Sequence, residues 1–340
     1  MYKRQSELIQ TFILSLMLNY HPDEVAFILI DYKGGGMANL FGGTPHVAGV
    51  ITNISESGRG EEKSSAASVN QTQRALLSLK SEIKRRQKIF SEFGVNHIDQ
   101  YSKLYRQGTA AEPLPHLIII SDEFAELKKE QPEFIKELVS TARVGRSLGI
   151  HLILATQKPS GVVDDEIWSN ARFKLCLKVQ DRQDSMEMLK RPEAADLTRI
   201  GRGYLQIGND ELFELFQSGY SGAEYQPELE PEELQLNQIE LLALDGTRTH
   251  RRTRRPAGSQ SVSQLDACVA YISETAQSAG VHPARKLWLP MLRSEITLEP
   301  LLDQLPDRPY SAILGRIDYP EQQAQPLYTL SFPRCGNVLI

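Results

Sequence analysis

The sequence predicts an α/β protein whose sheet is mostly parallel. Apolar runs at residues 25–30, 117–120 and 150–155 each resemble a buried strand, because a parallel strand is covered on both faces and loses the polar–apolar alternation. Long helical patterns separate these runs, as crossover connections between parallel strands require. A chain of 340 residues with 41% hydrophobic content is large enough to bury such a core and an appendage.

The first helix and strand lead into a glycine-rich loop. Apolar residues at helical spacing predict a helix that ends at a His-Pro-Asp turn, residues 21–23, and the strand at 25–30 follows. After it come Asp31, Tyr32, Lys33 and three glycines, which permit close approach to a nucleotide or a neighbouring subunit. A plain flexible connector is the alternative for this loop.

A long helix is the main connection to the next buried strand. A short strand at 47–52 and a polar stretch at 56–68, expected to be an exposed loop, precede it. The helix itself is predicted over 71–93, with a shorter helix at 98–105. Its basic residues are expected on a solvated face: Arg74, Lys80, Lys84, Arg85, Arg86 and Lys88.

A further helix at 132–148 carries Arg143 and Arg146, which share a face because they are three residues apart. An arginine finger, which reaches the γ-phosphate across a subunit interface, is one role for them and is worth ~10³ to 10⁵ in rate. Ordinary surface arginines are the alternative. The parallel sheet is expected to be completed by elements at residues 173–179, 183–189, 203–207 and 211–216.

The run at 117–120 ends in Ser121, Asp122 and Glu123, the pattern of a Walker B strand. In a phosphate-handling enzyme such a strand carries Asp122 toward Mg²⁺, and Glu123 polarises the water that attacks the γ-phosphate of ATP. The alternative is a buried strand whose acidic end merely caps the next helix.

A second strand supports the catalytic interpretation. The run at 150–155 ends in Thr156 and Gln157. Ligands of open α/β sheets bind outside the carboxyl ends of the strands, so these two residues are expected to converge with Asp122 and Glu123 on one γ-phosphate. Gln157 would sense or orient the attacking water.

Composition limits the remaining classes. The chain has neither a run of about twenty apolar residues that could span a bilayer nor a signal-peptide pattern at its start. Its three cysteines are far apart and lack metal-ligand spacing, so buried thiols are expected. A net charge of −5 argues against a uniformly basic nucleic-acid binder but leaves a local DNA channel open.

The sequence changes character after residue 225. An acidic, proline-broken stretch and an arginine-rich run predict a linker over 226–261. An amphipathic helix follows, and residues 262–340 are expected to hold this connector helix and the partial start of a next module, cut within a final apolar strand.

Four stretches together resemble the FtsK/SpoIIIE ATPase superfamily, and most closely the EssC/EccC motors of type VII secretion. They are LIDYKGGGM at 29–37, ISDEFAEL at 120–127, STARVGRSLGIHL at 140–152 and ATQKPSGV at 155–162. The resemblance implies a RecA-like P-loop NTPase core at residues 1–225 that uses ATP and Mg²⁺, within a longer membrane-anchored protein.

The resemblance also implies partners and a location. Such motors act as homo-oligomers, with a hexameric ring expected, at the cytoplasmic face of the membrane with other type VII components. Their cargo is small WXG-motif helical-hairpin effectors. On this basis Ser6, Asp31, Lys33 and Thr156 are expected to contact the nucleotide, and Ser6 and Asp122 the metal.

The chain departs from the family pattern at its start. A Walker A loop should precede residue 7, yet Gln5 stands where the phosphate-binding lysine belongs, and only Ser6 fits the Mg²⁺-binding hydroxyl position. ATP binding by this chain is therefore expected to be impaired. Either residues 1–5 are not native sequence, or the module is a degenerate scaffold.

Two other functions thus remain beside a protein-secretion ATPase. A degenerate scaffold module would be a structural element that does not hydrolyse ATP. A DNA translocase would use the same nucleotide chemistry, and salt-sensitive duplex binding would reveal it. The glycine-rich loop, the run at 160–165 and the acidic net charge favour secretion.

Overall fold

The computed structural model describes residues 5–31, 36–52, 65–159, 161–163, 165–208, 211–225, 239–242, 248–251, 262–289, 292, 295–302, 304 and 310–332. Its centre is a parallel sheet, as predicted, and the strand order is β2-β1-β3-β4. The strands are β1 (Val25–Asp31), β2 (Val47–Thr52), β3 (His116–Asp122) and β4 (Ile150–Leu154).

Strand β1 shows why both faces of the sheet must be covered. All seven of its residues are buried. Ala26, Ile28 and Ile30 belong to one hydrophobic cluster, and Phe27 and Leu29 belong to another. Because successive side chains of a strand point to opposite faces, these two clusters are the cores on the two sides of the sheet.

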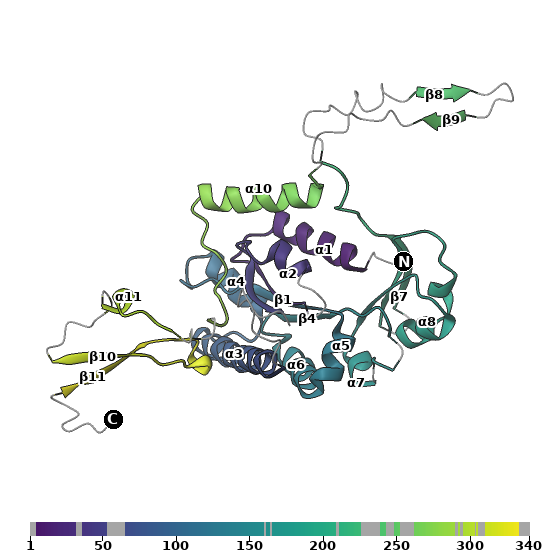
Figure 1. Ribbon diagram of the computed structural model, residues 1–340. Coiled ribbons are helices and arrows are strands. Elements are labelled where there is room, and N and C mark those ends of the chain that lie inside the picture. Colours follow the sequence, from purple (N-terminus) through teal and green to yellow (C-terminus); the bar gives the residue numbers. More distant parts are fainter. Residues whose placement is uncertain are drawn as a thin grey trace.

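Helices cover each of these cores, as predicted. On one side lie α1 (Gln5–Asn19), α2 (Gly36–Phe41) and α10 (Gln264–Ser278). On the other side lie α3 (Ser65–Phe93), α4 (Ile98–Arg106), α5 (Phe124–Glu130) and α6 (Pro132–Gly145). Figure 1 shows α1, α2 and α10 above the strands and α3 and α6 below them.

The expectation of a solvated basic face on α3 is wrong for two of its members. Arg74 is buried and bonds to Asp318 and to the carbonyl of Leu289, and Arg86 is buried more deeply. This side chain is 2% exposed and bonds to Glu82, to the carbonyl of Leu148 (2.7 Å) and to the carbonyl of Pro115 (2.9 Å). Arg86 therefore ties α3 to the amino ends of β3 and β4. Its guanidinium group donates hydrogen bonds to carbonyl oxygens that lie just before the two strands.

Residues beyond α7 (Asp165–Asn170) form a separate antiparallel sheet rather than edge strands of the first one. Its order is β5-β6-β7, with β5 (Phe173–Leu177), β6 (Arg202–Ile207) and β7 (Leu212–Gln217). Helix α8 (Arg182–Leu189) and the turn η1 (Glu193–Asp196) cover one face through a small cluster that includes Cys176 and Leu189. Predicting the strands did not reveal which strands pair.

The segment after α10 packs onto the first domain. Helix α10 contacts α1 and α2, and the backbone of Ala284 and Leu287 donates to Pro45 and Ala48, beside the edge strand β2. The most C-terminal elements are α11 (Glu299–Leu302), η2 (Pro320–Gln322) and a hairpin of β10 (Ser311–Arg316) and β11 (Leu327–Ser331).

The predicted linker contains structure. Strands β8 (Ile239–Leu242) and β9 (Arg248–Arg251) pair antiparallel within residues 226–261.

Across the described ranges, every helix is too short or too polar to qualify as a membrane span.

Candidate functional site

The carboxyl ends of β1 and β3 bring two aspartates together. Asp31 and Asp122 are paired residues of these neighbouring strands. Ser6, at the start of α1, donates its hydroxyl hydrogen to Asp122 Oδ2 at 3.3 Å. Asp31 is 4% exposed, and its Oδ2 accepts from the backbone nitrogens of Met37 (2.8 Å) and Ala38 (3.4 Å). Asp31 thus caps α2 while standing beside Asp122.

This arrangement favours a cation. Burial raises the pKa of the Asp122 carboxyl, and the negative charges of Asp31 and Glu123 raise it further, while the hydrogen bond from Ser6 lowers it. A carboxylate held beside other carboxylates is stabilised by a nearby positive charge. Carboxylate and hydroxyl oxygens are also the ligands that Mg²⁺ prefers, so the residues present fit this metal.

Glu123 is held in an unusual backbone conformation. Its φ is 56°, in the left-handed region, where it forms the N-cap of α5. Two backbone hydrogen bonds enforce this turn: Ala155 donates to Ser121, and Phe124 donates to Ala155, both at 2.9 Å. The cost of such a conformation for a residue with a side chain is about 1 to 3 kcal/mol, and the surrounding structure must offset it.

The strand end that follows β4 holds the Glu123 carboxylate. Glu123 Oε1 accepts from Thr156 Oγ1 at 3.1 Å and from the backbone nitrogen of Gln157 at 3.4 Å. Glu123 is 5% exposed, whereas the Gln157 side chain is exposed. The structure therefore brings Asp122, Glu123, Thr156 and Gln157 to one edge of the sheet, as their positions in the sequence predict.

Gln5 is a contact that sequence reasoning did not anticipate. In the orientation that satisfies both groups, its amide oxygen accepts from the Thr156 nitrogen at 2.8 Å and its amide nitrogen donates to the Thr156 oxygen at 3.0 Å. The residue at the expected lysine position is thus engaged with the backbone of the strand end that also holds Glu123.

The loop after Gln157 is also anchored by two side chains that no sequence motif indicated. Lys128 of α5 donates to the carbonyl of Val162 at 2.7 Å, and Glu187 of α8 accepts from the nitrogen of Gly161 at 3.1 Å. Gly161 has a φ of 72°. Pro159 and Gly161 in that short stretch were the sequence signals of a tight turn there.

The remaining predicted site residues lie elsewhere. Arg143 and Arg146 are exposed at the end of α6, which leads into the amino end of β4, and the charge of Arg146 acts on His151 there. They therefore lie at the edge of the sheet opposite Glu123 of the same chain, so a finger role would require a second subunit and stays a prediction. Lys33 lies outside the described residues.

Comparison with known proteins connects this geometry to a family. A model of the FtsK/SpoIIIE family matches residues 5–161. The chain is 49% identical to the type VII secretion system protein EssC of Staphylococcus aureus (strain Mu50), over 99% of this chain and 23% of that protein. It is 47% identical to the ESX secretion system protein YukB of Bacillus subtilis (strain 168), over 98% of this chain and 21% of that protein.

Among solved structures, the cytoplasmic domain of the Thermomonospora curvata type VII secretion ATPase EccC is similar, with a TM-score of 0.72 and 25% identity. That match covers 97% of this chain and 34% of the other. It confirms the predicted α/β ATPase fold. The chain spans less than a quarter of the length of the two curated relatives.

Proposed function

Because the chain belongs to the FtsK/SpoIIIE family, with the family model covering residues 5–161, we propose that it is a Mg·ATP-driven motor module of type VII protein secretion. The observation that carries the proposal is the placement of Glu123, whose carboxylate is held by Thr156 and Gln157 at the carboxyl edge of the sheet. That edge is where open α/β sheets bind their ligands.

Each residue of the edge has a role in this proposal. Ser6 and Asp122 hold Mg²⁺, which when bound supplies positive charge to the phosphate oxygens of ATP. Glu123 accepts a proton from the attacking water, and Thr156 fixes the carboxylate that does so. Gln157 orients the same water through its exposed amide. Asp31 keeps the start of α2 in place.

The relatives are named as secretion-system proteins, and the family resemblance of the sequence motifs extends the proposal to assembly and cargo. A module of this type would act in a hexameric ring, with other type VII components, at the cytoplasmic face of the membrane. Its cargo would be small WXG-motif helical-hairpin effectors. An arginine finger for the ring would come from Arg143 or Arg146 of the neighbouring subunit, since both are exposed at the far edge of this one.

A scaffold module is the second candidate, and one contact favours it. Gln5 cannot supply the positive charge of a Walker A lysine, and its amide is occupied by the backbone of Thr156. A module with this contact would bind ATP weakly and act as a structural element of the ring.

Binding and turnover of Mg·ATP separate these two functions. The chain is compared with a version in which residues 1–5 are replaced by a glycine-rich loop that ends in lysine. We expect binding and hydrolysis in the second version, with hydrolysis lost and binding kept after Glu123→Gln. If neither version binds nucleotide, the assignment of this edge is wrong and the scaffold function stands.

A further inference from the structure

A second group of charged side chains lies around Trp168 of α7, apart from the carboxylate edge. The ammonium nitrogen of Lys174 lies 4.0 Å from the centre of the Trp168 ring, and that of Lys190 lies 5.1 Å from it. Lys174 comes from β5 and Lys190 from the end of α8. Strand β5 and helix α8 therefore each direct one cation to the indole of α7.

Lys174 lacks the partner that a buried charge ordinarily has. It is 6% exposed, yet neither it nor the exposed Lys190 forms an ion pair or hydrogen bond with any side chain that the structure describes. Lysine is almost never this buried unless it is paired. A contact with an aromatic ring offsets only part of the cost of burying an ammonium group.

The indole itself offers a third unused donor. Trp168 Nε1 is buried and has no hydrogen-bond acceptor in the part of the chain that the structure describes. Buried donors of this kind are normally satisfied. Two ammonium groups and one unsatisfied N–H group are thus gathered at the Trp168 side chain.

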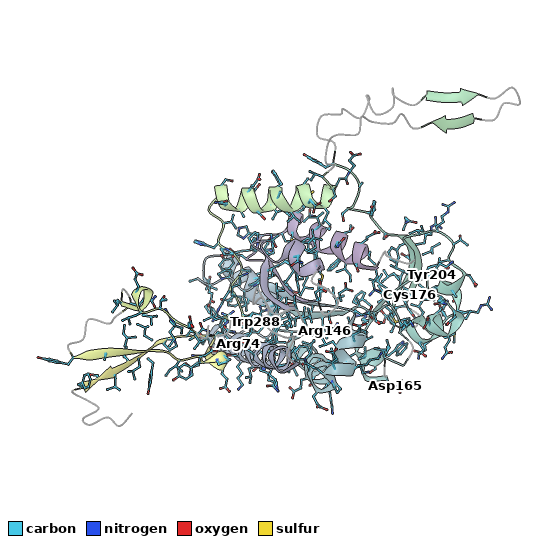
Figure 2. The ribbon with its side chains drawn as sticks, in the orientation of Figure 1. Arg74, Arg146, Asp165, Cys176, Tyr204 and Trp288 are labelled. Carbon is cyan, nitrogen blue, oxygen red and sulfur yellow. The ribbon has the colours of Figure 1, made fainter. Side chains whose placement is uncertain are left out.

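Two acidic side chains of this region are engaged elsewhere. Glu187 of α8 accepts from the nitrogen of Gly161, and Glu193 lies 3.9 Å from Arg191. Arg191 in turn lies over the ring of Phe213, with 4.4 Å between its guanidinium carbon and the ring centre. Arg191 and Phe213 thus form a further cation–aromatic contact in this part of the chain. Figure 2 shows Tyr204, which stacks on Phe213, in the same antiparallel sheet beside α8.

From these contacts we infer that Trp168, Lys174 and Lys190 form a binding site for an anionic group, a carboxylate or a phosphate. An anion between the two ammonium groups removes their mutual repulsion and accepts a hydrogen bond from the indole. Burial, together with the charge of Lys190, lowers the pKa of the Lys174 ammonium group, as expected for a cation that no negative charge neutralises. The site is separate from the proposed nucleotide edge and goes beyond that function.

Fluorescence of Trp168 tests the inference without any nucleotide. The chain has two tryptophans, so a Trp288→Phe background leaves Trp168 as the only reporter. This protein is titrated with sodium phosphate and, separately, with sodium acetate, while sodium chloride keeps the ionic strength constant. We expect a saturable change in emission, with an apparent affinity at least tenfold weaker after Lys174→Met.

Two further variants make the result decisive. Lys190→Met changes an exposed lysine and is expected to weaken binding even if Lys174→Met fails to fold. Lys84→Met, which removes an exposed lysine from α3, is the matched control and should leave the titration unchanged. Saturation with phosphate alone identifies a phosphate site, and saturation with acetate identifies a carboxylate site. The inference is overturned if the emission of the parent does not change on titration. It is also overturned if Lys174→Met and Lys190→Met both give the same titration as the parent.

Discussion

At the scale of single residues, Thr156 has the clearest effect on the candidate catalytic group. Its hydroxyl donates to Glu123 Oε1 at 3.1 Å, and a hydrogen bond to a charged group is worth about 1.5 to 3 kcal/mol. In the version whose residues 1–5 are replaced by a glycine-rich loop, we expect Thr156→Val to lower ATP turnover by ~10- to 100-fold, because the Glu123 carboxylate then loses this hydrogen bond.

Steady-state hydrolysis and equilibrium binding of Mg·ATP measure this effect. Thr156→Ser keeps the hydroxyl and should retain most of the turnover, and nucleotide affinity should be similar in all three proteins. Equal turnover in the Val and Ser variants would show that Thr156 does not position Glu123.

Two histidines at the opposite edge of the sheet predict a pH dependence of stability. Burial lowers the pKa of both His116 and His151, whose ring nitrogens lie 3.0 Å apart; the charge of Arg86 lowers both further, and Asp99 opposes it. Since both pKa values lie below those of the unfolded chain, the unfolded state binds more protons, and stability present above pH ~6.5 is lost as the pH falls.

Urea unfolding between pH 8 and pH 5 measures this loss. The free energy of unfolding should fall less steeply with acid in the double variant His116→Gln/His151→Gln than in the parent. A residual slope is expected from His46, whose pKa burial also lowers. Identical slopes in parent and variant would remove these two histidines as the cause.

At the scale of elements, α3 depends on a buried ion pair for its attachment to the sheet. Arg86 and Glu82 are 2% and 1% exposed in their side chains, and Arg86 also donates to two backbone carbonyls. Arg86→Met leaves Glu82 with Arg85 alone and deprives those carbonyls of a donor, so we expect a loss of about 3 to 5 kcal/mol in the free energy of unfolding.

Chemical denaturation measures this cost against an exposed pair on the same helix. Lys88 and Glu92 are largely exposed, and Lys88→Met should change stability by less than about 0.5 kcal/mol. A small loss in Arg86→Met, comparable to that control, would mean that the buried pair contributes little net stability.

The same helix shows what the sequence can and cannot predict. Strands β1, β3 and β4 were predictable because a long apolar run is typical of a strand buried on both faces of a parallel sheet. The candidate site was predictable because the carboxyl ends of such strands lie at one edge of the sheet. The burial of Arg86 was not predictable, because two of its partners are carbonyl groups far away in the sequence. The pairing of β5, β6 and β7 was likewise hidden, since a strand's pattern does not name its neighbour.

The left-handed backbone of Glu123 belongs to the same class of features. Its cause is a pair of hydrogen bonds between the ends of β3 and β4, which depend on the strand order. Gln5 is the reverse case: the sequence marked it as a departure from the Walker A pattern, and only its partner, Thr156, was unknown.

At the scale of the whole molecule, the segment after α10 is attached to the edge strand β2 and to helix α3. Lys286 donates to the carbonyl of Val47 at 2.7 Å beside the edge strand β2. Arg74 of α3 forms an ion pair with Asp318 and donates to the carbonyl of Leu289 at 3.0 Å. Figure 2 shows Arg74 and Trp288 close to each other at this junction.

Close packing at Gly49 gives this junction a sharp test. A Cβ added at Gly49 would lie 2.5 Å from Trp288 Cζ2, so the indole must move when Gly49 is replaced. We expect Gly49→Ala to cost about 1 to 3 kcal/mol in the free energy of unfolding, as overpacking does. In a Trp168→Phe background, which leaves Trp288 as the reporter, the emission should shift to the red as the ring gains solvent.

Gly43→Ala is the matched control, because a Cβ at Gly43 has no atom within 4 Å. It should leave both the emission and the stability unchanged. If Gly49→Ala behaves like Gly43→Ala, Trp288 does not rest on β2 in solution, and the edge of the sheet is covered in another way. If the emission shifts while the two backbone bonds from Ala284 and Leu287 still protect their amides from exchange, the ring alone moves and the segment stays attached.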